Sequence, residues 1–148
     1  MKVSTKVECG ILAMADIALH DTSETVTVSS ISQRQNISVK YLEQILPALR
    51  QANLIHSMKG SKGGYMLALP PEDITLKQII DALDITILGD VQFRDMDRDQ
   101  ILTDVIQSCL WDRMTQSLQR IATSVTLQDI VDAYQKSAAE DAALMYYI

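Results

Sequence analysis

The chain has 148 residues, 47% of them apolar, with two cysteines and a formal net charge of −6. This length and composition predict one compact domain, or one small domain with an oligomerising appendage, and exclude a disordered chain. Two lone cysteines are neither a disulfide framework nor a zinc site. Because Glu8 and Asp16 interrupt the N-terminal apolar segment, it is neither a secretory leader nor a membrane span. We therefore expect a cytoplasmic protein with no membrane partner.

The charge is divided unevenly along the chain. Residues 1–70 carry seven Lys and Arg against five Asp and Glu, a net of +2, whereas residues 71–148 carry six against fourteen, a net of −8. No acid lies between positions 44 and 71, although three bases do. The first half can therefore face a polyanion while the acidic second half faces away from it.

The first half of the chain predicts a helix-turn-helix. Apolar spacing predicts a helix over residues 2–20, and a polar loop separates it from a short helix that begins at Thr27 or Val28 and ends near Gln35. A further helix is predicted over about 38–53, and the serine at its start has the residue type of an N-cap. Two helices joined by such a short turn are typical of the helix-turn-helix.

The second helix of this motif has an apolar and a polar face. The apolar face is formed by four residues at helical spacing: Leu42, Ile45, Leu46 and Leu49. The opposite face is formed by Lys40, Glu43, Gln44, Pro47 and Gln51. Because Pro47 has no N–H to donate, we expect a bend or a boundary near Glu43 to Ile45.

A basic β-hairpin follows the helix-turn-helix. Residues 54–58 and 65–69 have strand composition, and the turn between them contains three of the five glycines together with Lys59 and Lys62. A helix-turn-helix followed at once by a hairpin is a winged helix. The predicted fold class is therefore mainly α with a small β-hairpin, and residues 1–84 form a winged helix-turn-helix domain.

The second half predicts a dimerisation element. Thr75 and Gln78 are spaced as a capping box for a helix that ends near Asp84, and residues 85–97 predict a loop. A long helix over 98–123 carries an apolar stripe that we expect to form a homodimer interface: Leu102, Ile106, Leu110, Met114 and Leu118. Residues 124–148 predict a short helix from Thr126 to Gln135 and a tail.

The winged helix predicts binding to double-stranded DNA. In this geometry the second helix of the motif enters the major groove, and its N-terminal residues face the bases: Ser38, Lys40, Tyr41, Glu43 and Gln44. Glu43 can accept a hydrogen bond from cytosine, and Gln44 suits adenine. The candidates for phosphate or minor-groove contacts are Lys2, Lys6, Arg34, Arg50, Lys59 and Lys62. The alternative is a winged helix that binds proteins and leaves its polar face solvated.

Few residues are candidates for chemistry. Cys9 and Cys109 are redox or metal candidates, although isolated cysteines in apolar stripes more commonly act as small hydrophobes. Lys6 is expected to lower the pKa of the Cys9 thiol. His20 and His56 lack the spaced partners of a metal site, and the sequence contains no phosphate-loop or catalytic motif. We therefore expect neither an enzyme nor a cofactor.

Three strings carry a resemblance to a known family: MKVSTK, ISVKYLEQILPALRQANLI and KGSKGGYMLALPPEDITLKQII. In this order they resemble the Rrf-two family of bacterial winged-helix regulators, and the likeness continues through the LW pair at 110–111 to the TLQDI at 126–130. The resemblance implies a homodimer held by the long helix and bound to an imperfect inverted repeat in promoters. It also implies base and groove contacts by Tyr41, Glu43, Gln44 and Lys59.

Cluster-carrying members of this family place three cysteines in the loop before the long helix and in its first turn. Residues 85–108 of this chain contain no cysteine. The alternative that the family offers is therefore a redox or iron–sulfur sensor that uses Glu8, Cys9 and Cys109. The cysteine-free loop is similar to that of the family's cysteine-metabolism repressors, so we interpret the chain as a repressor without a cofactor.

The C-terminus ends in the apolar string AALMYYI. The cysteine-metabolism repressors end in a similar peptide and act with cysteine synthase. The resemblance therefore implies a peptide that docks on that enzyme through Tyr146, Tyr147 and Ile148. The alternative is that these residues pack onto the body or the partner subunit.

Overall fold

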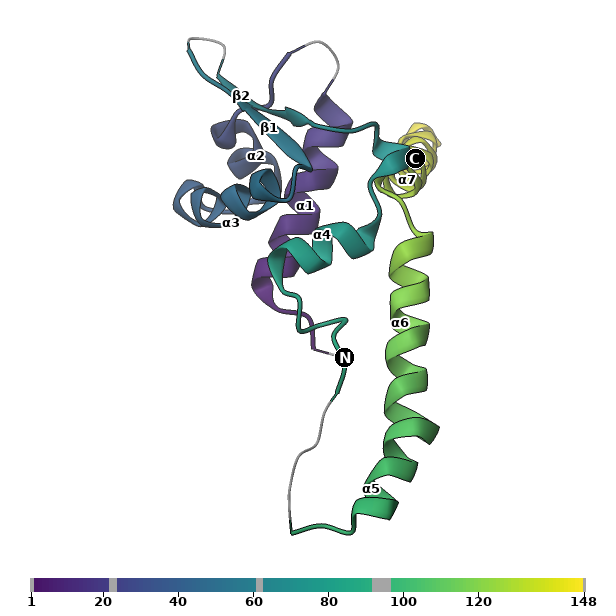
Figure 1. Ribbon diagram of the computed structural model, residues 1–148. Coiled ribbons are helices and arrows are strands. Elements are labelled where there is room, and N and C mark those ends of the chain that lie inside the picture. The colour runs from purple at the N-terminus through teal and green to yellow at the C-terminus, as the bar shows by residue number, and fades with distance from the viewer. Residues whose placement is uncertain (1, 22–23, 61–62, 92–96, 148) are drawn as a thin grey trace.

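Three helices, a hairpin and a fourth helix form a globular body from which a helical arm and a last helix extend (Figure 1). A computed structural model describes residues 2–21, 24–60, 63–91 and 97–147. The elements of the body are α1 (Thr5–His20), α2 (Val28–Gln35), α3 (Val39–Gln51), β1 (Ile55–Met58), β2 (Gly64–Leu67), η1 (Pro71–Asp73) and α4 (Leu76–Leu83). The arm and the last helix are α5 (Gln100–Ile106), η2 (Gln107–Trp111), α6 (Asp112–Ser124) and α7 (Leu127–Tyr146). The mainly helical fold with one hairpin confirms the predicted fold class.

Side-chain caps define where the first three helices begin. The hydroxyls of Ser4, Thr27 and Ser38 each accept a hydrogen bond from the backbone N–H three residues later, at 3.4, 3.1 and 3.1 Å. These bonds pair N–H groups that the first turn of a helix leaves without a partner. Because Ser4 is the cap, α1 begins at Thr5 and not at residue 2 as predicted. The turn between α2 and α3 contains Asn36 at φ 53°, a left-handed conformation that asparagine tolerates.

Helix α3 continues through its proline, Pro47. The structure has one helix from Val39 to Gln51, so the boundary considered near Glu43 to Ile45 is not present. The apolar residues on both sides of Pro47 are buried: Leu42, Ile45, Leu46 and Leu49. Their burial outweighs the loss of one helical hydrogen bond, which is worth about 1 kcal/mol.

The hairpin is held to the body by a short bridge that the sequence did not indicate. β1 and β2 pair antiparallel, with Ile55 opposite Leu67. Val26, in the segment predicted as a loop, exchanges two backbone hydrogen bonds with Tyr65 at 2.8 and 2.7 Å. A side chain on Gly64 would lie 2.7 Å from the Val26 carbonyl oxygen, so this close approach requires glycine.

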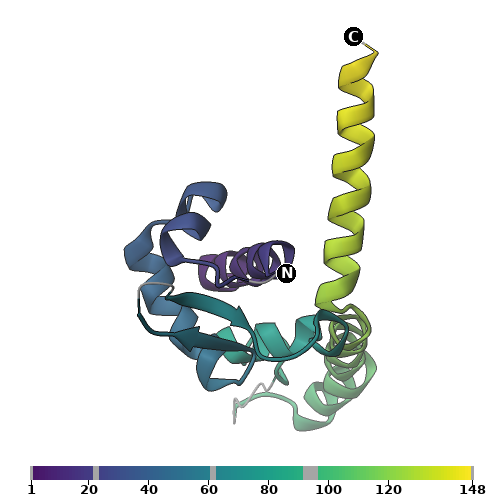
Figure 2. The same cartoon turned by 90° about the horizontal axis from the view of Figure 1, so that it is seen from above.

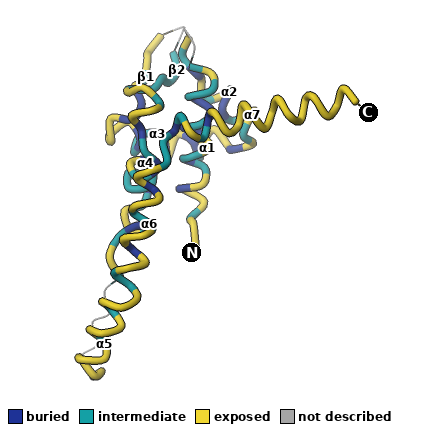
Figure 3. The backbone as a smooth tube through the Cα atoms, turned by 90° about the vertical axis from the view of Figure 1, so that its right-hand side faces the viewer, coloured by how far each residue is buried: buried dark blue, intermediate teal, exposed yellow. Residues whose placement is uncertain are grey.

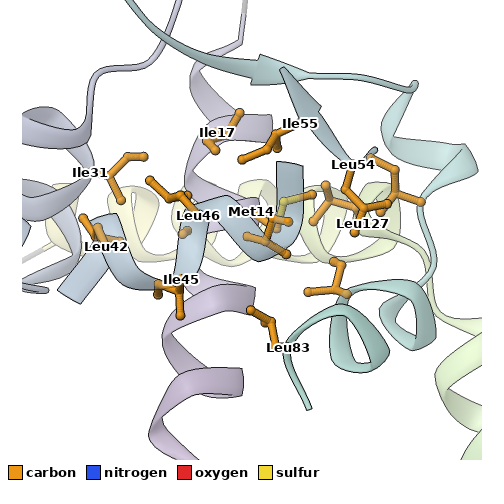
Figure 4. Close-up of a cluster of buried hydrophobic side chains, with 14 of the residues drawn as sticks. Met14, Ile17, Ile31, Leu42, Ile45, Leu46, Leu54, Ile55, Leu83 and Leu127 are labelled. Atoms are coloured by element: carbon orange, nitrogen blue, oxygen red, sulfur yellow. The ribbon is translucent and has the colours of Figure 1, made fainter. Parts of the chain in front are cut away.

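The core lies where α1, α3, α4 and the base of the hairpin meet (Figure 4). Met14 and Ile17 of α1, Leu46 of α3 and Ile79 of α4 are fully buried. Leu127 at the start of α7 is also fully buried in this cluster, so the last helix is anchored in the body at its first turn. Leu, Ile, Val, Met and Ala fill this core, in a chain that contains one Phe and one Trp.

The arm is a continuous helical segment with a π-helical turn inside it. α5 begins after the N-cap Asp99, and α6 ends at Ser124, so the predicted long helix is confirmed. Between them, η2 forms one wider π turn. A π turn rotates the face that the following residues present, so a strict four-residue stripe does not continue unchanged from α5 into α6. The arm runs away from the body with most of its surface exposed (Figure 3).

The last helix is longer than predicted. The sequence analysis expected a short helix that ends near Gln135 and a tail, whereas α7 has 20 residues and ends at Tyr146. Thr126 and Asp129 form its capping box, and the segment 138–143 is rich in alanine, the residue with the highest helix propensity. Beyond Val131 every described residue of α7 is exposed, and the helix projects from the body (Figure 2). No helix among the described residues is both long and apolar enough to cross a membrane.

Candidate nucleic-acid interface

The N-terminal half of α3 presents polar side chains to solvent. Ser38, Lys40, Glu43 and Gln44 are exposed, whereas the opposite face of the helix is buried in the core. Ser38 Oγ accepts the capping hydrogen bond from the Tyr41 N–H, which leaves its own O–H free to donate. These four side chains therefore lie together on one outward surface, where they can reach a polar partner.

Tyr41 is not part of this outward surface. Its ring is half-buried and packs against the hydrophobic core. On a helix, residue 41 lies about 90° or more from residues 40 and 43, which explains why it leaves their face. The structure thus brings together four of the five residues predicted at the start of the helix.

The hairpin extends the same surface beyond the C-terminal end of α3. Lys59 follows β1 and is exposed. Arg50, in the last turn of α3, has its Nη1 within 3.4 Å of Ser57 Oγ in β1, and its side chain remains exposed. Lys62, predicted at the hairpin tip, lies outside the described residues. α3 and the base of the hairpin therefore form one connected polar and basic surface.

Arg34, predicted to contact phosphate, is instead an internal ion-pair partner. Its Nε and Nη2 donate to the two carboxylate oxygens of Asp16 at 2.9 and 2.8 Å. Gln35 Nε2 donates to the same carboxylate at 2.9 Å. Asp16 is fully buried on α1, so this network fixes α2 of the helix-turn-helix against α1. The Arg34 guanidinium is thus held by a buried carboxylate that is distant in sequence, and its predicted phosphate contact stays a prediction.

The Asp16 carboxylate is ionised in this environment. Burial by itself would raise its pKa, but the hydrogen bonds from Arg34 and Gln35 and the Arg34 charge lower the pKa below its ordinary value. His20 at the end of α1 adds to this effect, since its Nδ1 lies 3.8 Å from Asp16 Oδ1 and 2.8 Å from the Asp16 carbonyl oxygen. His20 therefore has a structural role at the end of α1.

Lys2 and Lys6 lie beside the end of α4 and the arm. Hydrogen bonds from the hydroxyl and N–H of Thr86 lower the pKa of Asp84, and the Lys6 charge contributes in the same direction. Lys2 lines a hollow that it shares with Met114 and Leu118 of the arm. Their predicted contacts with phosphate stay a prediction.

The two cysteines do not form a site. Cys9 is half-buried on α1, and burial, followed by the Glu8 charge, raises the pKa of its thiol. This contradicts the expectation that Lys6 lowers it. Cys109 is exposed in η2. Among the described residues no three His, Cys, Asp or Glu side chains are arranged to hold a metal ion, and segment 92–96 contains neither Cys nor His. Within one chain, the described residues therefore bring together no donor set for a cluster.

Sequence reasoning missed Val39. This apolar residue opens α3 and is 41% exposed. It lies one helical turn before Glu43 on the same side of the helix. An exposed apolar side chain at this point can contact the methyl group of thymine in a major groove. The sequence signal was that Val39 precedes Glu43 by four residues, which places both on one side of the helix. It was overlooked because valine is apolar and the other candidates on this side are polar.

Comparison with known proteins assigns a family to this fold and surface. The model of a family described as iron-dependent transcriptional regulators, Rrf2, matches residues 3–133. The chain belongs to the Rrf2 family. The resemblance found in the sequence is thereby confirmed, and the chain is a transcriptional regulator, related to proteins named as regulators and not as enzymes.

Rrf2 relatives match along most of the chain. The regulator CymR of Bacillus subtilis is 32% identical over 148 residues, the whole of both chains. A putative regulator of Neisseria meningitidis, NMA1593, is 37% identical over 89% of this chain and 88% of that protein. Among solved structures, B. subtilis CymR, titled the global cysteine regulator, superposes with a TM-score of 0.76 at 32% identity over 90% of this chain and 98% of that chain. T. potens IscR superposes at 0.74, with 34% identity over 93% and 90%.

Proposed function

We propose that this Rrf2 regulator binds an inverted-repeat operator as a homodimer, with α3 in the major groove and the hairpin against phosphates or a neighbouring groove. The observation that carries the proposal is the continuous outward surface of α3 and the hairpin, polar at the helix start and basic at Arg50 and Lys59. The membership of the chain in a family of transcriptional regulators and its winged-helix fold both support DNA binding by this surface.

The side chains on this surface divide into two roles. Glu43 and Gln44 read bases, with Ser38 and Lys40 beside them, because their acceptors and donors match base edges. Val39 contacts a thymine methyl group. Arg50 and Lys59 neutralise phosphates and add affinity with little sequence preference. Lys2, Lys6, Tyr41 and Lys62 stay candidates, whereas Arg34 is not included because Asp16 holds it.

The arm provides the dimer interface in this proposal. Four residues of the predicted stripe are 42 to 57% exposed in the single chain: Leu102, Ile106, Leu110 and Met114. Leu118 is half-buried, and Ile121 beyond it is 61% exposed. An apolar strip of this length is typical of a subunit interface. The corresponding division of the chain is a DNA-binding domain over 1–84, a loop over 85–97 and a dimerisation helix over 98–123.

Control of cysteine or sulfur genes is the regulatory role that the relatives support. The supporting observation is the likeness over the whole chain to B. subtilis CymR, whose structure is titled as that of a global cysteine regulator. We assign repression on the same likeness. The proposal includes no cofactor, since the described residues of one chain bring together no three His, Cys, Asp or Glu donors. The visible absorption spectrum of protein purified without air should lack a cluster band, and a band would support the iron–sulfur alternative.

A salt titration tests DNA binding. The affinity for a promoter fragment should fall steeply with salt, since log K declines by about 0.9 per log unit of salt for each neutralised phosphate. Lys59→Ala should reduce the slope by about one, whereas Lys136→Ala on the exposed part of α7 should not change it. Affinity that does not depend on salt, or no affinity, would favour a winged helix that binds proteins.

The end of α7 is a second candidate surface, for cysteine synthase. Leu144, Met145, Tyr146 and Tyr147 are 64 to 93% exposed, which is unfavourable for a stable apolar terminus in water. Ile148, the proposed docking residue, lies outside the described residues. Deletion of Ile148 should abolish capture of the enzyme in a pull-down. Retained capture would contradict docking, and loss of dimerisation would instead support packing on the partner subunit.

A further inference from the structure

A cavity of about 400 Å³ lies where α1, the end of α2 and the first half of α7 meet. Among the described residues, none from α3, the hairpin or the arm lines it. It is therefore separate from the surface proposed to bind DNA and from the apolar strip of the arm. Its volume is within the range of small-molecule sites in proteins.

The cavity has an apolar wall on two sides. The apolar lining residues come from one face of α1 and one side of α7: Leu12, Ala15, Leu19, Ile130, Val131 and Tyr134. The side chains of Leu12 and Tyr134, on opposite walls, remain 39 and 58% exposed. Exposed apolar surface is unfavourable in water, so a ligand with an apolar body between the two helices would be stabilised by covering it.

A charged pair forms the polar end of the cavity, and its two members differ in exposure. Asp16 is inaccessible to solvent and accepts three hydrogen bonds from Arg34 and Gln35. The Arg34 side chain is 36% exposed. Its Nε and Nη2 donate to Asp16, and Nη2 also lies 3.3 Å from Ser30 Oγ. Arg34 Nη1 makes no hydrogen bond among the described residues, so its two N–H groups remain available as donors.

This difference in exposure selects the charge of a ligand. Because the Asp16 carboxylate is inaccessible and paired, the charge that a ligand meets is the Arg34 guanidinium. A cationic ligand is repelled by it, and an uncharged apolar ligand would cover its N–H groups without replacing the water bound to them. A carboxylate accepts charge-assisted hydrogen bonds from such a nitrogen. One available guanidinium nitrogen matches a singly charged carboxylate better than a doubly charged phosphate.

We propose that this cavity binds a small carboxylate with an apolar body. The carboxylate accepts from Arg34, and the apolar body lies between Leu12 of α1 and Tyr134 of α7. Such a ligand contacts α2 through Arg34 and α7 through Tyr134, so it joins the last helix to the helix-turn-helix. Binding at this site depends neither on DNA nor on a partner subunit.

Calorimetric titration of the intact protein without DNA tests this site. The probe is 4-phenylbutyrate. Three controls change one property each: 4-phenylbutan-1-ol removes the charge, 4-phenylbutylamine reverses it, and acetate removes the apolar body. We expect saturable binding of one 4-phenylbutyrate per chain and at least tenfold weaker binding of each control. The melting temperature should rise with its concentration, because the ligand binds only the folded chain. No saturable binding, or equal binding of the alcohol or the amine, would overturn the proposal.

Two variants with the same substitution on neighbouring residues of α7 test the apolar wall. Tyr134→Asp removes the ring and places a negative charge beside the carboxylate of the ligand, so it should weaken 4-phenylbutyrate binding at least tenfold. Gln135→Asp adds the same charge at an exposed position outside the cavity, about 100° around the helix, and should leave binding unchanged. Equal losses in both variants would contradict the site, as would unchanged binding by Tyr134→Asp.

Arg34→Lys tests the polar end. Lysine keeps the positive charge and can donate to Asp16, but it has no second nitrogen for the ligand. This variant should therefore also lose at least tenfold in affinity for 4-phenylbutyrate. Should it fail to fold, Leu12→Asp on the opposite wall provides the second variant, with the same expected loss. Wild-type affinity in the folded variant would overturn the proposal.

Discussion

The residue with the largest structural consequence in the helix-turn-helix is a buried carboxylate. Asp16 is inaccessible to solvent, and Arg34 and Gln35 supply three hydrogen bonds to it. The sequence showed Asp16 only as an interruption of an apolar segment, because its partners lie 18 and 19 residues away. A buried charge is retained at the cost of desolvation and becomes strongly unfavourable when its partner is lost. The orientation of α2 on α1, and with it the position of α3, depends on this pair.

Asp16→Ala should therefore lower the free energy of unfolding by about 2 kcal/mol at pH 7, because it removes the buried acceptor of three hydrogen bonds from Arg34 and Gln35. The folded-state pKa of Asp16 is below its ordinary value of about 3.9, so the pair stabilises the protein above that pH. This stabilisation is lost as the pH falls through the folded-state pKa. Urea unfolding at pH 7 and at decreasing pH should show the difference between wild type and variant shrink in acid. Asp141→Ala is the matched surface control, and an equal loss in it would contradict the assignment.

Glu43 and Lys59 should differ in what they contribute to DNA binding. Glu43→Ala should relax discrimination at one base pair by about 1–3 kcal/mol, because it removes an acceptor that faces a base edge. Lys59→Ala should weaken binding to all DNA sequences by the same factor. Competition between duplexes that differ at single positions measures both effects. Unchanged site preferences in Glu43→Ala would exclude α3 as the reading element.

Val39 should be sensitive to a single methyl group of the DNA. Replacing the contacted thymine by deoxyuridine removes only that methyl and should cost about 1 kcal/mol. Val39→Ala should bind the thymine duplex more weakly and show no further loss with deoxyuridine. A full effect of deoxyuridine in Val39→Ala would show that another residue makes the contact.

At the scale of elements, features set by neighbouring residues were predictable. The caps Ser38 and Thr75 and the glycine-rich hairpin follow from local hydrogen bonding and turn geometry, and the structure has them where expected. The π turn in the arm could not be predicted, because the spacing of apolar residues does not reveal an extra residue in a helical turn. The full length of α7 was also not predicted, because its second half is exposed and has no buried face. On α3, four of the five expected residues share one surface. The half-burial of Tyr41 and the ion pair of Arg34 could not be predicted, because tertiary packing sets both.

The proposed homodimer should dissociate into monomers when a charged residue is placed in the apolar strip of the arm. Leu110 is 44% exposed in the single chain, so Leu110→Asp should fold, but in a dimer it would bury an unpaired charge. Analytical ultracentrifugation should show monomers for Leu110→Asp and dimers for the conservative Leu110→Met. A Leu110→Asp protein that sediments as a dimer would place the interface elsewhere.

At the scale of the whole molecule, the chain combines a globular body with two projecting helical segments. The proposed DNA-binding surface is on α3 and the hairpin, and the exposed apolar strip is on the arm. The last helix, α7, extends from the body in a separate direction (Figures 1 and 2). The positive half of the sequence contains the reading surface, and the negative half contains the arm and α7. This separation allows the body to approach a polyanion while the acidic segments stay away from it.

The measurement that tests the account most directly is selection of bound sequences from a library of random DNA duplexes by the intact protein. A dimer that reads DNA with two copies of α3 should enrich an inverted repeat whose half-sites lie about one helical turn, roughly 34–36 Å, or a multiple of it apart. Glu43→Ala should lose preference at one symmetric pair of positions within that repeat. Enrichment of no sequence, or of a single half-site without symmetry, would contradict a dimeric regulator that reads its operator through α3.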